Sequence, residues 1–535
     1  MSASSTRPHA VVDRSTSPPR VEVPRRYNAA ADFVDRHLDE GRGAKAAFLD
    51  DDGETTYAAL AERVNRAGNA LRALGVGMEQ RVALALLDTA RLPAVFFGAI
   101  KIGAVPVPIN TLLSAEDYDQ ILRDSRARVL VVSAPLLDRI APILPGQPFL
   151  EHVVIDGAVP GGAVPGGAAS LAALLDAADP ELEAAPTTAD DVAFWLYTSG
   201  STGQLKAAVH AQSDLVHTAE LYGVAVLGIR EDDLVFSAAK LFFAYGLGNA
   251  MSFPLRVGAT AVLMAERPTP ASIRRRLVER RPTLFYGVPT LYAAMLADPE
   301  LDTGGRLRAC TSAGEALPAD LGRRWRERTG VDILDGIGST ELLHIYLSNR
   351  PDDVRYGTTG KVVPGYEVKL VDEAGAEVAP GEVGDLWVSG PSSAVHYWNR
   401  RELTRATFHG RWTRTGDHYL RDEDGYYVYQ GRSDDMLKVG GIYVSPFEME
   451  SALITHPAVL EAAVVAHKDE HGLVKPRALI VLREPRGAST SLAEELKAHV
   501  KARLAPYKYP RWVEFVAELP KTATGKIQRF KLRGR

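Results

Sequence analysis

The residues best suited to chemistry form one short segment, Tyr197-Thr-Ser-Gly-Ser-Thr-Gly-Gln-Leu-Lys206, directly after an apolar run. Hydroxyl groups and backbone N–H groups of such a loop can converge on phosphate oxygens, and glycine lets the backbone approach closely. The lysine adds a positive charge. A run of Ser, Thr and Gly is by itself most often a surface turn, so its position behind a buried strand is what favours a phosphate-binding loop.

Four further segments carry weaker signals. Asp335-Gly-Ile-Gly-Ser-Thr-Glu341 follows another apolar run, and Glu341 can hold Mg²⁺ on phosphate oxygens. In Arg414-Thr-Gly-Asp417, a carboxylate after a turn can accept two hydrogen bonds from ribose hydroxyls. Gly431-Arg-Ser-Asp-Asp-Met-Leu-Lys-Val-Gly-Gly441 is a polar connector that ends in glycine, and Pro520-Lys-Thr-Ala-Thr-Gly-Lys-Ile-Gln-Arg529 is a basic tail that alone indicates only a solvated end.

Several well-known motifs are missing from the sequence. The loop is not a Walker A sequence, and no GxGxxG follows a strand, which argues against a dinucleotide fold. GxSxG, HExxH and paired CxxC are also absent, which argues against serine hydrolase and zinc chemistry.

Alternating strand and helix patterns must position these segments. Apolar spacing predicts a helix over 29–40 with Phe33, Val34 and Leu38 on one face, then a helix over 57–74. Strands over 81–87 and 105–109 flank a helix over 91–102, and the same alternation recurs between about 190 and 335. Such alternation implies parallel strands joined by right-handed crossovers. After about residue 360, short strands and turns predict antiparallel hairpins, and a compact unit follows Gly431-Arg432.

Length and composition limit the classes of protein that remain. The 535 residues indicate several domains, and 46% hydrophobic with 24% charged residues is ordinary for a globular protein. A net charge of −5 gives no electrostatic case for binding nucleic acid or an anionic membrane. The single Cys310 cannot form an internal disulfide, and no apolar run is long enough to span a membrane. We therefore expect a cytoplasmic enzyme; a homodimer is compatible with this but not indicated by any residue.

Taken in order, these segments resemble the adenylate-forming superfamily of acyl-CoA synthetases, firefly luciferase and peptide-synthetase adenylation domains. The resemblance covers about residues 28–532 and includes Ser312–Pro318 (SAGEALP). Segments 240–249 (KLFFAYGLGN), 281–293, 335–350 and 356–368 are similar to the benzoate-CoA ligase branch. The implied fold is α/β, with a large N-terminal domain of parallel βα subdomains plus a β-barrel-like portion and a small mobile α+β C-terminal domain. The implied boundaries are a flexible lead-in over 1–26, an AMP-binding domain over 27–431 and a mobile domain over 432–535.

The resemblance also implies substrates and roles. A carboxylate would attack the α-phosphate of ATP to give acyl-AMP and pyrophosphate, and coenzyme A would then displace AMP. ATP would be held by Thr198, Ser199, Gly200, Ser201, Thr202, Gly203, Lys206, Gly314, Glu315, Ala316, Asp335, Gly336, Ile337, Asp417 and Arg432. Within this set, residues 314–316 and 335–337 would border the adenine, and Asp417 and Arg432 would hold the ribose. Glu341 would bind Mg²⁺, and Thr340 would contact the α-phosphate.

The remaining implied roles concern the C-terminal domain. Lys526 matches the lysine that bridges the carboxylate and the α-phosphate, where two anions must meet. Asp434 matches the hinge about which the small domain rotates. After rotation Lys438 would face the site, and Gly440 and Gly441 would leave room for the pantetheine arm of coenzyme A.

The implied acid pocket suits a short, flat aromatic acid. It comprises Ala244, Tyr245, Gly338, Leu343, His344 and Ile345. Small and branched walls favour a slot over a long tunnel, and Tyr245 or His344 can place a polar contact near the carboxylate or the ring edge. Benzoate is the first choice, with hydroxy- and aminobenzoates as close competitors because an apolar pocket rejects one added hydroxyl poorly.

The sequence differs from the family pattern at two positions beside the loop lysine, and it leaves two alternative functions to consider. Leu205 and Ala207 stand where the family usually has proline and glycine around the loop lysine, which predicts a more mobile unliganded loop. Delivery of the acyl group to a carrier protein is an alternative to coenzyme A. A non-catalytic binding protein is disfavoured, because Lys526, Glu341 and the loop hydroxyls are all present.

Overall fold

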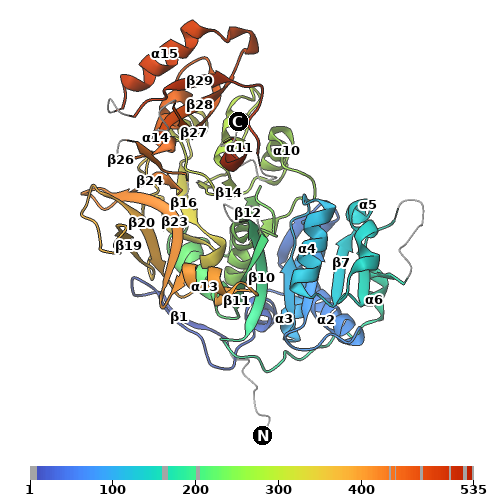
Figure 1. Ribbon diagram of the computed structural model, residues 1–535. Coiled ribbons are helices and arrows are strands. Elements are labelled where there is room, and N and C mark those ends of the chain that lie inside the picture. Colours follow the sequence, from blue (N-terminus) through green and yellow to red (C-terminus); the bar gives the residue numbers. More distant parts are fainter. Residues whose placement is uncertain are drawn as a thin grey trace.

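The first alternating strands and helices form a five-stranded parallel sheet with the order β6-β5-β7-β8-β9 (Figure 1). The computed structural model describes residues 9–159, 167–199, 205–432, 435–439, 442–469, 474–504, 508–521 and 527–532. The strands are β5 (Arg81–Ala85), β6 (Val105–Pro108), β7 (Val129–Ser133), β8 (His152–Asp156) and β9 (Ala169–Ser170), and the accompanying helices are α2 (Tyr57–Ala73), α3 (Arg91–Lys101), α4 (Ala115–Ser125), α5 (Leu137–Ile140) and α6 (Leu171–Ala177). Helix α3 is buried along most of its length, and a Cβ on its Gly98 would lie 2.8 Å from the Cβ of Ala67, so glycine permits the close approach of α2.

A nine-stranded sheet, ordered β18-β17-β16-β15-β14-β12-β13-β3-β4, forms the second layer and carries the strands that lead into the site. Its inner strands are parallel, and antiparallel pairs lie at both edges. The strands are β3 (Ala46–Asp50), β4 (Gly53–Thr56), β12 (Leu234–Ser237), β13 (Thr260–Val262), β14 (Leu284–Gly287), β15 (Ala309–Ser312), β16 (Ile333–Gly338), β17 (Ile345–Ser348) and β18 (Lys361–Val362). The helical segments are α7 (Asp214–Thr218), η5 (Ala219–Val224), α8 (Ala244–Leu247), η6 (Gly248–Ser252), α9 (Phe253–Val257), α10 (Pro270–Arg280), α11 (Pro289–Leu296) and α12 (Ala319–Thr329).

Between these sheets lies an antiparallel hairpin, β10 (Val192–Ser199) with β11 (Leu205–Ala211). Strand β21 (His396–Tyr397), almost two hundred residues further along the chain, pairs with the outer side of β11. Apolar side chains of the hairpin pack against the strand β6 of the first sheet, through Trp195, Ala207 and Val209. The hairpin therefore links the first sheet to the segment that contains Tyr397.

The antiparallel strands expected after residue 360 form a separate five-stranded sheet, seen beside α13 (Arg401–Thr407) in Figure 1. Its strands are β19 (Glu367–Val371), β20 (Val383–Ser389), β22 (Phe408–His409), β23 (Trp412–Arg421) and β24 (Tyr427–Arg432). Because β23 and β24 are paired, Asp417 lies directly opposite Arg432.

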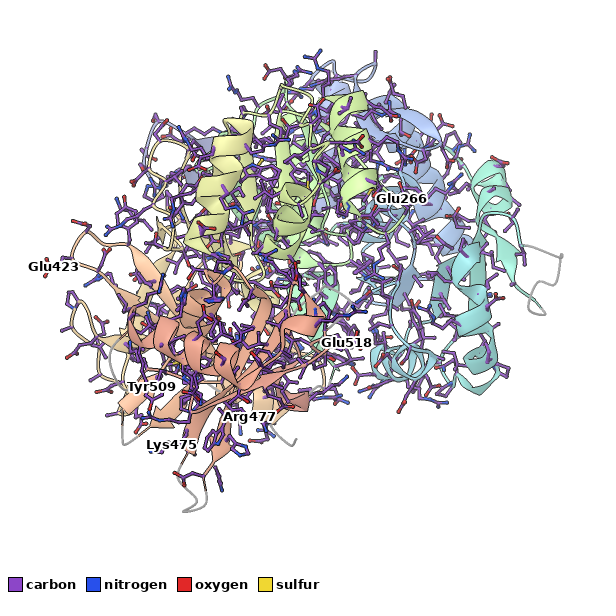
Figure 2. The ribbon with its side chains drawn as sticks, turned by 90° about the horizontal axis from the view of Figure 1, so that it is seen from above. Glu266, Glu423, Lys475, Arg477, Tyr509 and Glu518 are labelled. Atoms are coloured by element: carbon purple, nitrogen blue, oxygen red, sulfur yellow. The ribbon has the colours of Figure 1, made fainter. Side chains whose placement is uncertain are left out.

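A small α+β domain follows, with its own hydrophobic core of residues from Leu437 onward. Its elements are β25 (Leu437–Val439), β26 (Ile442–Val444), α14 (Pro446–Ile454), β27 (Val459–Lys468), β28 (Val474–Leu482), α15 (Thr490–Lys501) and β29 (Trp512–Phe515). Figure 2 places Lys475, Arg477 and Tyr509 on this domain, apart from Glu266 on the large domain. The expected boundary after residue 431 falls at the end of β24, and rotation about it remains a prediction.

The predicted α/β fold class is confirmed, with differences near the N-terminus. Residues expected to form a lead-in without structure contain a hairpin of β1 (Val11–Asp13) and β2 (Arg20–Glu22), and Arg14 pairs with the buried Glu220 at 2.8 Å. The helix expected over 29–40 begins as a short π-helix, η1 (Ala31–Asp35), and continues as the α-helix α1 (Arg36–Asp39). Phe33 and Val34, expected on one face of this helix with Leu38, are fully buried, whereas Leu38 is 41% exposed. No helix within the described ranges is long and apolar enough to cross a membrane.

Candidate active site

The predicted phosphate loop connects the two strands of the β10–β11 hairpin. Thr198 pairs with Lys206 and Ser199 with Leu205, so both ends of the loop are fixed by strand pairing. Leu205 and Ala207, the two departures from the family pattern, are both buried in this hairpin. Gly200, Ser201, Thr202 and Gly203 lie outside the described residues, and their predicted role is untested.

Lys206, Glu341 and Tyr397 form a triangle of polar contacts at the end of the hairpin. The Lys206 ammonium donates to Glu341 Oε1 at 2.9 Å and to the Tyr397 hydroxyl at 2.6 Å. Tyr397 in turn donates its hydroxyl proton to Glu341 Oε1. Sequence reasoning predicted Lys206 and Glu341 separately but missed Tyr397, which no local motif marks.

The Glu341 carboxylate is kept ionised by these neighbours. Burial opposes its charge, but the Lys206 ammonium and the hydrogen bond from Tyr397 prevail and lower the pKa of Glu341 to about 2. An ionised carboxylate among hydroxyl groups suits Mg²⁺, which commonly takes one or two protein carboxylates and completes its shell with substrate phosphates and water. No cluster of three or more His, Cys, Asp or Glu side chains that could cage a metal occurs in the described part of the chain. The donor set therefore fits a magnesium ion that arrives with a nucleotide.

Thr340 and Glu341 lie in a short 3-10 turn, η7 (Thr340–Leu342), which directly follows β16. The Glu341 carbonyl accepts the Ala394 N–H at 2.8 Å, and the Thr340 carbonyl lies 2.8 Å from His210 Nε2. Segments more than fifty residues away thus hold the turn on two sides. Neither Ala394 nor His210 was predicted from the sequence.

The residues expected around the nucleoside come from neighbouring strands. Arg432 Nη1 donates to Asp417 Oδ1 at 3.0 Å across the β23–β24 pair. Asp335, Gly336 and Ile337 lie in β16, and β15 alongside it leads into the segment of Gly314, Glu315 and Ala316, with Ser312 paired to Asp335. The two segments predicted to border the adenine are therefore brought together.

The Asp335 side chain carries an unusual buried carboxyl group. Burial raises its pKa well above the usual value, against hydrogen bonds from the backbone of Leu317 and Gly336. Its Oδ1 has no hydrogen-bond partner among the described residues, and a buried polar atom without a partner calls for a ligand or a water. Its position fits the predicted adenine site.

The predicted acid-pocket residues gather around His344. Its Nε2 lies 3.2 Å from the Tyr245 carbonyl, and the two rings have centroids 5.7 Å apart. Gly338 pairs with Ile345, and a Cβ on Gly338 would lie 2.5 Å from the His344 carbonyl oxygen. Ala244 is the first residue of α8, next to Tyr245. Strand pairing and this helix start therefore place the predicted residues at one location.

Three further residues enclose the His344 ring and were not predicted. Tyr222 and Phe253 have ring centroids 5.2 and 4.5 Å from it, and a Cβ on Gly248 would lie 2.3 Å from His344 Cδ2. Tyr222 and Gly248 belong to the short π-helices η5 and η6, a geometry often found at functional sites. Hydrophobic periodicity in the sequence does not predict such π-helices.

Of the two polar side chains expected in the pocket, that of Tyr245 has its hydrogen bonds satisfied, whereas that of His344 keeps one nitrogen without a partner among the described residues. The Tyr245 hydroxyl is bound to Thr311 Oγ1 at 2.6 Å and to the Gly287 carbonyl at 3.3 Å. Burial lowers the pKa of His344 to about 3, although the Tyr245 carbonyl favours the charged form. The ring is therefore neutral at pH 7 and donates from Nε2, and its Nδ1 is an acceptor without a partner among the described residues.

Leu343 holds a strained turn next to this histidine. Its φ is +64° and ψ −35°, and the His344 N–H donates to the Leu342 carbonyl at 2.8 Å, which defines a γ-turn centred on Leu343. A positive φ is costly for a leucine, by about 1–3 kcal/mol. The turn reverses the chain between the Mg²⁺ candidate Glu341 and the pocket residue His344.

We expect Leu343→Gly to be at least as stable as Leu343→Ala. Both remove the buried side chain, but glycine adopts the positive φ without strain, whereas glycine normally costs about 0.5–1 kcal/mol relative to alanine within regular elements. Urea unfolding of the two variants measures the difference. A lower midpoint for Leu343→Gly, by that ordinary margin, would show that the turn is unstrained.

The side chains of several other predicted site residues are not described by the structure. Lys526, Asp434, Gly440 and Gly441 are not among the described residues, and for Lys438 only its place in β25 is described. Their roles stay predictions.

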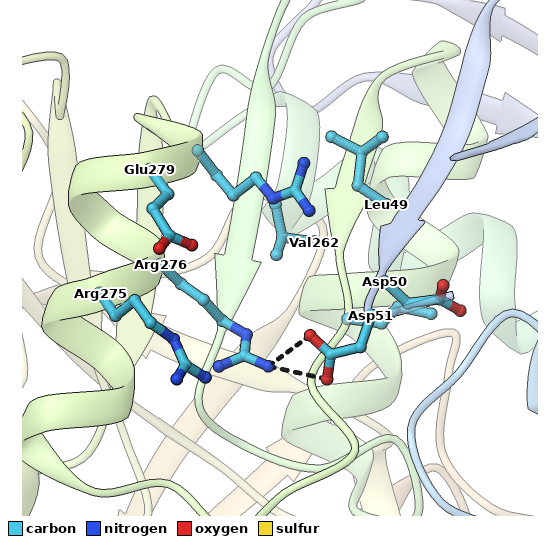
Figure 3. Close-up of a pocket in the computed structure, with 9 residues that line it drawn as sticks. Leu49, Asp50, Asp51, Val262, Arg275, Arg276 and Glu279 are labelled. Carbon is cyan, nitrogen blue, oxygen red and sulfur yellow. Dashed lines mark hydrogen bonds and ion pairs between the residues drawn. The ribbon is translucent and has the colours of Figure 1, made fainter. Parts of the chain in front are cut away.

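A cavity of about 310 Å³ lies elsewhere, between α10 and the end of β3 (Figure 3). Arg276 crosses it to form hydrogen bonds with both carboxylate oxygens of Asp51, at 2.8 and 2.9 Å. The residues that line it include none of the predicted site residues. We therefore assign the candidate active site to the region around Glu341 and His344.

Comparison with known proteins identifies the family. A family model described as AMP-binding enzyme matches residues 35–398, and one described as AMP-binding enzyme C-terminal domain matches residues 448–526. This chain belongs to the AMP-binding enzyme family. Within the family it is 62% identical to a benzoate–CoA ligase of Thauera aromatica, over 98% of this chain and 99% of the relative. It is 50% identical to a 4-hydroxybenzoate–CoA/benzoate–CoA ligase of Rhodopseudomonas palustris, over 95% and 94% of the two chains.

A solved family member gives the same result. The crystal structure of a benzoate CoA ligase from Burkholderia xenovorans superposes with a TM-score of 0.87 at 55% identity, covering 95% of this chain and 100% of that one. The predicted membership of the benzoate-CoA ligase branch is thereby confirmed.

Proposed function

We propose that this chain is an AMP-forming benzoate–CoA ligase. The observation that carries the proposal is the triangle of Lys206, Glu341 and Tyr397, joined through the turn at Leu343 to an aromatic-walled pocket around His344. A phosphate-binding cation, a carboxylate for Mg²⁺ and a slot for a flat ring are the groups that acyl adenylation needs. The named relatives act on benzoate or hydroxybenzoate, which agrees with that slot.

The first half-reaction joins two anions. A carboxylate oxygen of benzoate attacks the α-phosphorus of ATP, the bond from that phosphorus to the bridging oxygen breaks, and pyrophosphate leaves. Mg²⁺ held by Glu341 would neutralise charge on the phosphate oxygens. Lys206 would leave Glu341 for the β- and γ-phosphates, Thr340 would contact the α-phosphate, and Lys526 would bridge carboxylate and phosphate.

The second half-reaction transfers the acyl group. The thiol of coenzyme A attacks the carbonyl carbon of benzoyl-AMP, and AMP leaves with the oxygen that came from benzoate. Rotation about Asp434 would remove Lys526 and bring Lys438, Gly440 and Gly441 to the site. Asp417 and Arg432 would hold the ribose during both steps, since they lie in β23 and β24 at the edge of the large domain.

A hydroxy- or aminobenzoate is the second candidate substrate, favoured by one observation. The unpartnered Nδ1 of His344 can accept a hydrogen bond from a hydroxyl or amino substituent if it faces the ring. A site built to accept such a bond discriminates strongly against the analogue that lacks the donor. The ring substituent that the enzyme prefers therefore shows whether His344 Nδ1 accepts a hydrogen bond from the substrate.

Pyrophosphate release across a panel of benzoates, with and without coenzyme A, tests the function. We expect release that depends on the aromatic acid, and benzoyl-CoA and AMP when coenzyme A is added. Turnover only with an acyl carrier protein would favour the carrier alternative. Release that is independent of every aromatic acid would contradict the proposal.

Ala244→Phe is expected to reduce benzoate turnover at least about hundredfold, because the ring would fill a slot where misplacement by about 1 Å already costs that much. Ala244 is 9% exposed at the start of α8. The measurement is kcat/KM for benzoate, with a thermal melt to show that the variant is folded. Normal turnover by the folded variant would place the acid pocket elsewhere.

A further inference from the structure

Strand β11 contacts the Thr340–Leu342 turn at two points. Lys206 and His210 are four residues apart, and because side chains alternate along a strand they lie on the same face. Lys206 binds the Glu341 carboxylate, and His210 Nε2 lies 2.8 Å from the Thr340 carbonyl oxygen. One rigid strand thus fixes both the side chain and the backbone of the turn that carries the candidate catalytic groups.

The His210 ring is itself held on its other edge and on one face. Its Nδ1 lies 2.8 Å from Asp214 Oδ2, which also accepts the Ala211 N–H at 3.1 Å. The ring stacks on Phe194, with centroids 5.2 Å apart and an interplanar angle of 19°. The His210 and Asp214 side chains are almost fully buried, at 0% and 3% exposure. The orientation of the imidazole is therefore set before any ligand binds.

The contact between His210 and Thr340 has a defined direction. A carbonyl oxygen only accepts, so His210 Nε2 carries the hydrogen of this bond and points its N–H at the peptide between Thr340 and Glu341. Loss of that bond would leave the Thr340 carbonyl without its buried donor and free the peptide to rotate.

We infer that His210, oriented by Asp214, is a positioning residue for the adenylation step. Its side chain is fully buried against Asp214, Phe194 and the Thr340 carbonyl, so it would act through the peptide whose rotation would move both the Thr340 hydroxyl and the Glu341 carboxylate. The inference rests on the proposed function, because these two groups matter only if they meet the α-phosphate and Mg²⁺. The competing explanation is a histidine that only stabilises the core.

The variants His210→Gln and His210→Asn separate these explanations. The glutamine amide nitrogen reaches about as far as Nε2 and can keep the bond to Thr340, whereas the asparagine amide matches Nδ1 and can keep only the bond to Asp214. We expect His210→Asn to raise the KM for MgATP and lower the rate of pyrophosphate release by about tenfold or more, because small misplacements are costly. His210→Gln should recover most of both.

Three controls make the result specific. His217→Gln and His217→Asn repeat the substitutions at a partly buried histidine on α7 for which no hydrogen bond to the Thr340 turn is found among the described residues, and should leave the KM for MgATP unchanged. Conversion of added benzoyl-AMP and coenzyme A should remain normal in all four variants. Thermal melts measure the folded fraction.

The inference would be overturned if His210→Gln and His210→Asn had the same KM for MgATP and the same rate of pyrophosphate release. It would also be overturned if the rates of both half-reactions fell only in proportion to the folded fraction. Wild-type protein assayed alongside distinguishes a failure of the proposed ligase function from a failure of the positioning role of His210. An inactive wild type with every aromatic acid contradicts the proposed function, whereas an active wild type with an unaffected His210→Asn contradicts only the positioning role.

Discussion

Glu341→Gln is expected to lower the rate of pyrophosphate release by about two orders of magnitude or more. Glutamine has nearly the same shape but carries no charge, so the site would lose its attraction for Mg²⁺ and the partner of Lys206. The carboxylate is ionised at neutral pH, with a pKa of about 2, so its charge is fully present in the wild type. Pyrophosphate release measured against Mg²⁺ concentration should show a weakened metal dependence.

Glu423→Gln is the matched control, since Glu423 is an exposed carboxylate on the large domain (Figure 2). It should behave as wild type. If Glu341→Gln keeps both the normal rate and the normal Mg²⁺ dependence, Glu341 is not the metal ligand.

Lys526→Ala is expected to have an effect of similar size on the first half-reaction alone. The lysine would neutralise the repulsion between benzoate and the α-phosphate, and removing such a group typically costs about 10²–10³ in rate. Thioester formation from added benzoyl-AMP and coenzyme A should continue, because the lysine would then have moved away. Rapid-quench measurement of benzoyl-AMP separates the two steps.

Lys521→Ala controls for a lost charge in the same tail. Lys521 lies five residues upstream and donates to Glu461 at 2.5 Å within the small domain. It should leave both half-reactions unchanged. Benzoyl-AMP formation at the normal rate in Lys526→Ala would contradict the bridging role, and equal loss of both steps would contradict alternation of the domain.

Much of the fold followed from the sequence because its signals are local. The buried run 81–85 has the continuous apolar character of a parallel strand, and the strand predicted over 81–87 is observed as β5 (Arg81–Ala85). The strand β11 was missed, since Lys206 and His210 interrupt its apolar pattern in order to face the Thr340 turn. The single α-helix expected over 29–40 instead begins as a short π-helix, η1 (Ala31–Asp35), which apolar spacing does not reveal.

The candidate site was predictable only where a motif marks it. The segments of Lys206, Glu341 and Asp417 have recognisable local sequences, and the structure brings Lys206 and Glu341 into contact. Tyr397 and His210 have no such signature, because their function depends on contacts with residues 56 and 130 positions away. The clustering of Tyr222 and Gly248 around His344 likewise arises from packing between the separate π-helices η5 and η6.

The central claim is that a carboxylate oxygen of the substrate attacks the α-phosphorus of ATP, and isotope transfer tests this most directly. Benzoate labelled with ¹⁸O in both carboxylate oxygens would be turned over with ATP and coenzyme A, and the products analysed by mass spectrometry. The account predicts one ¹⁸O atom in each AMP, one in each benzoyl-CoA and none in pyrophosphate. Label in pyrophosphate or inorganic phosphate, or AMP without label, would contradict it.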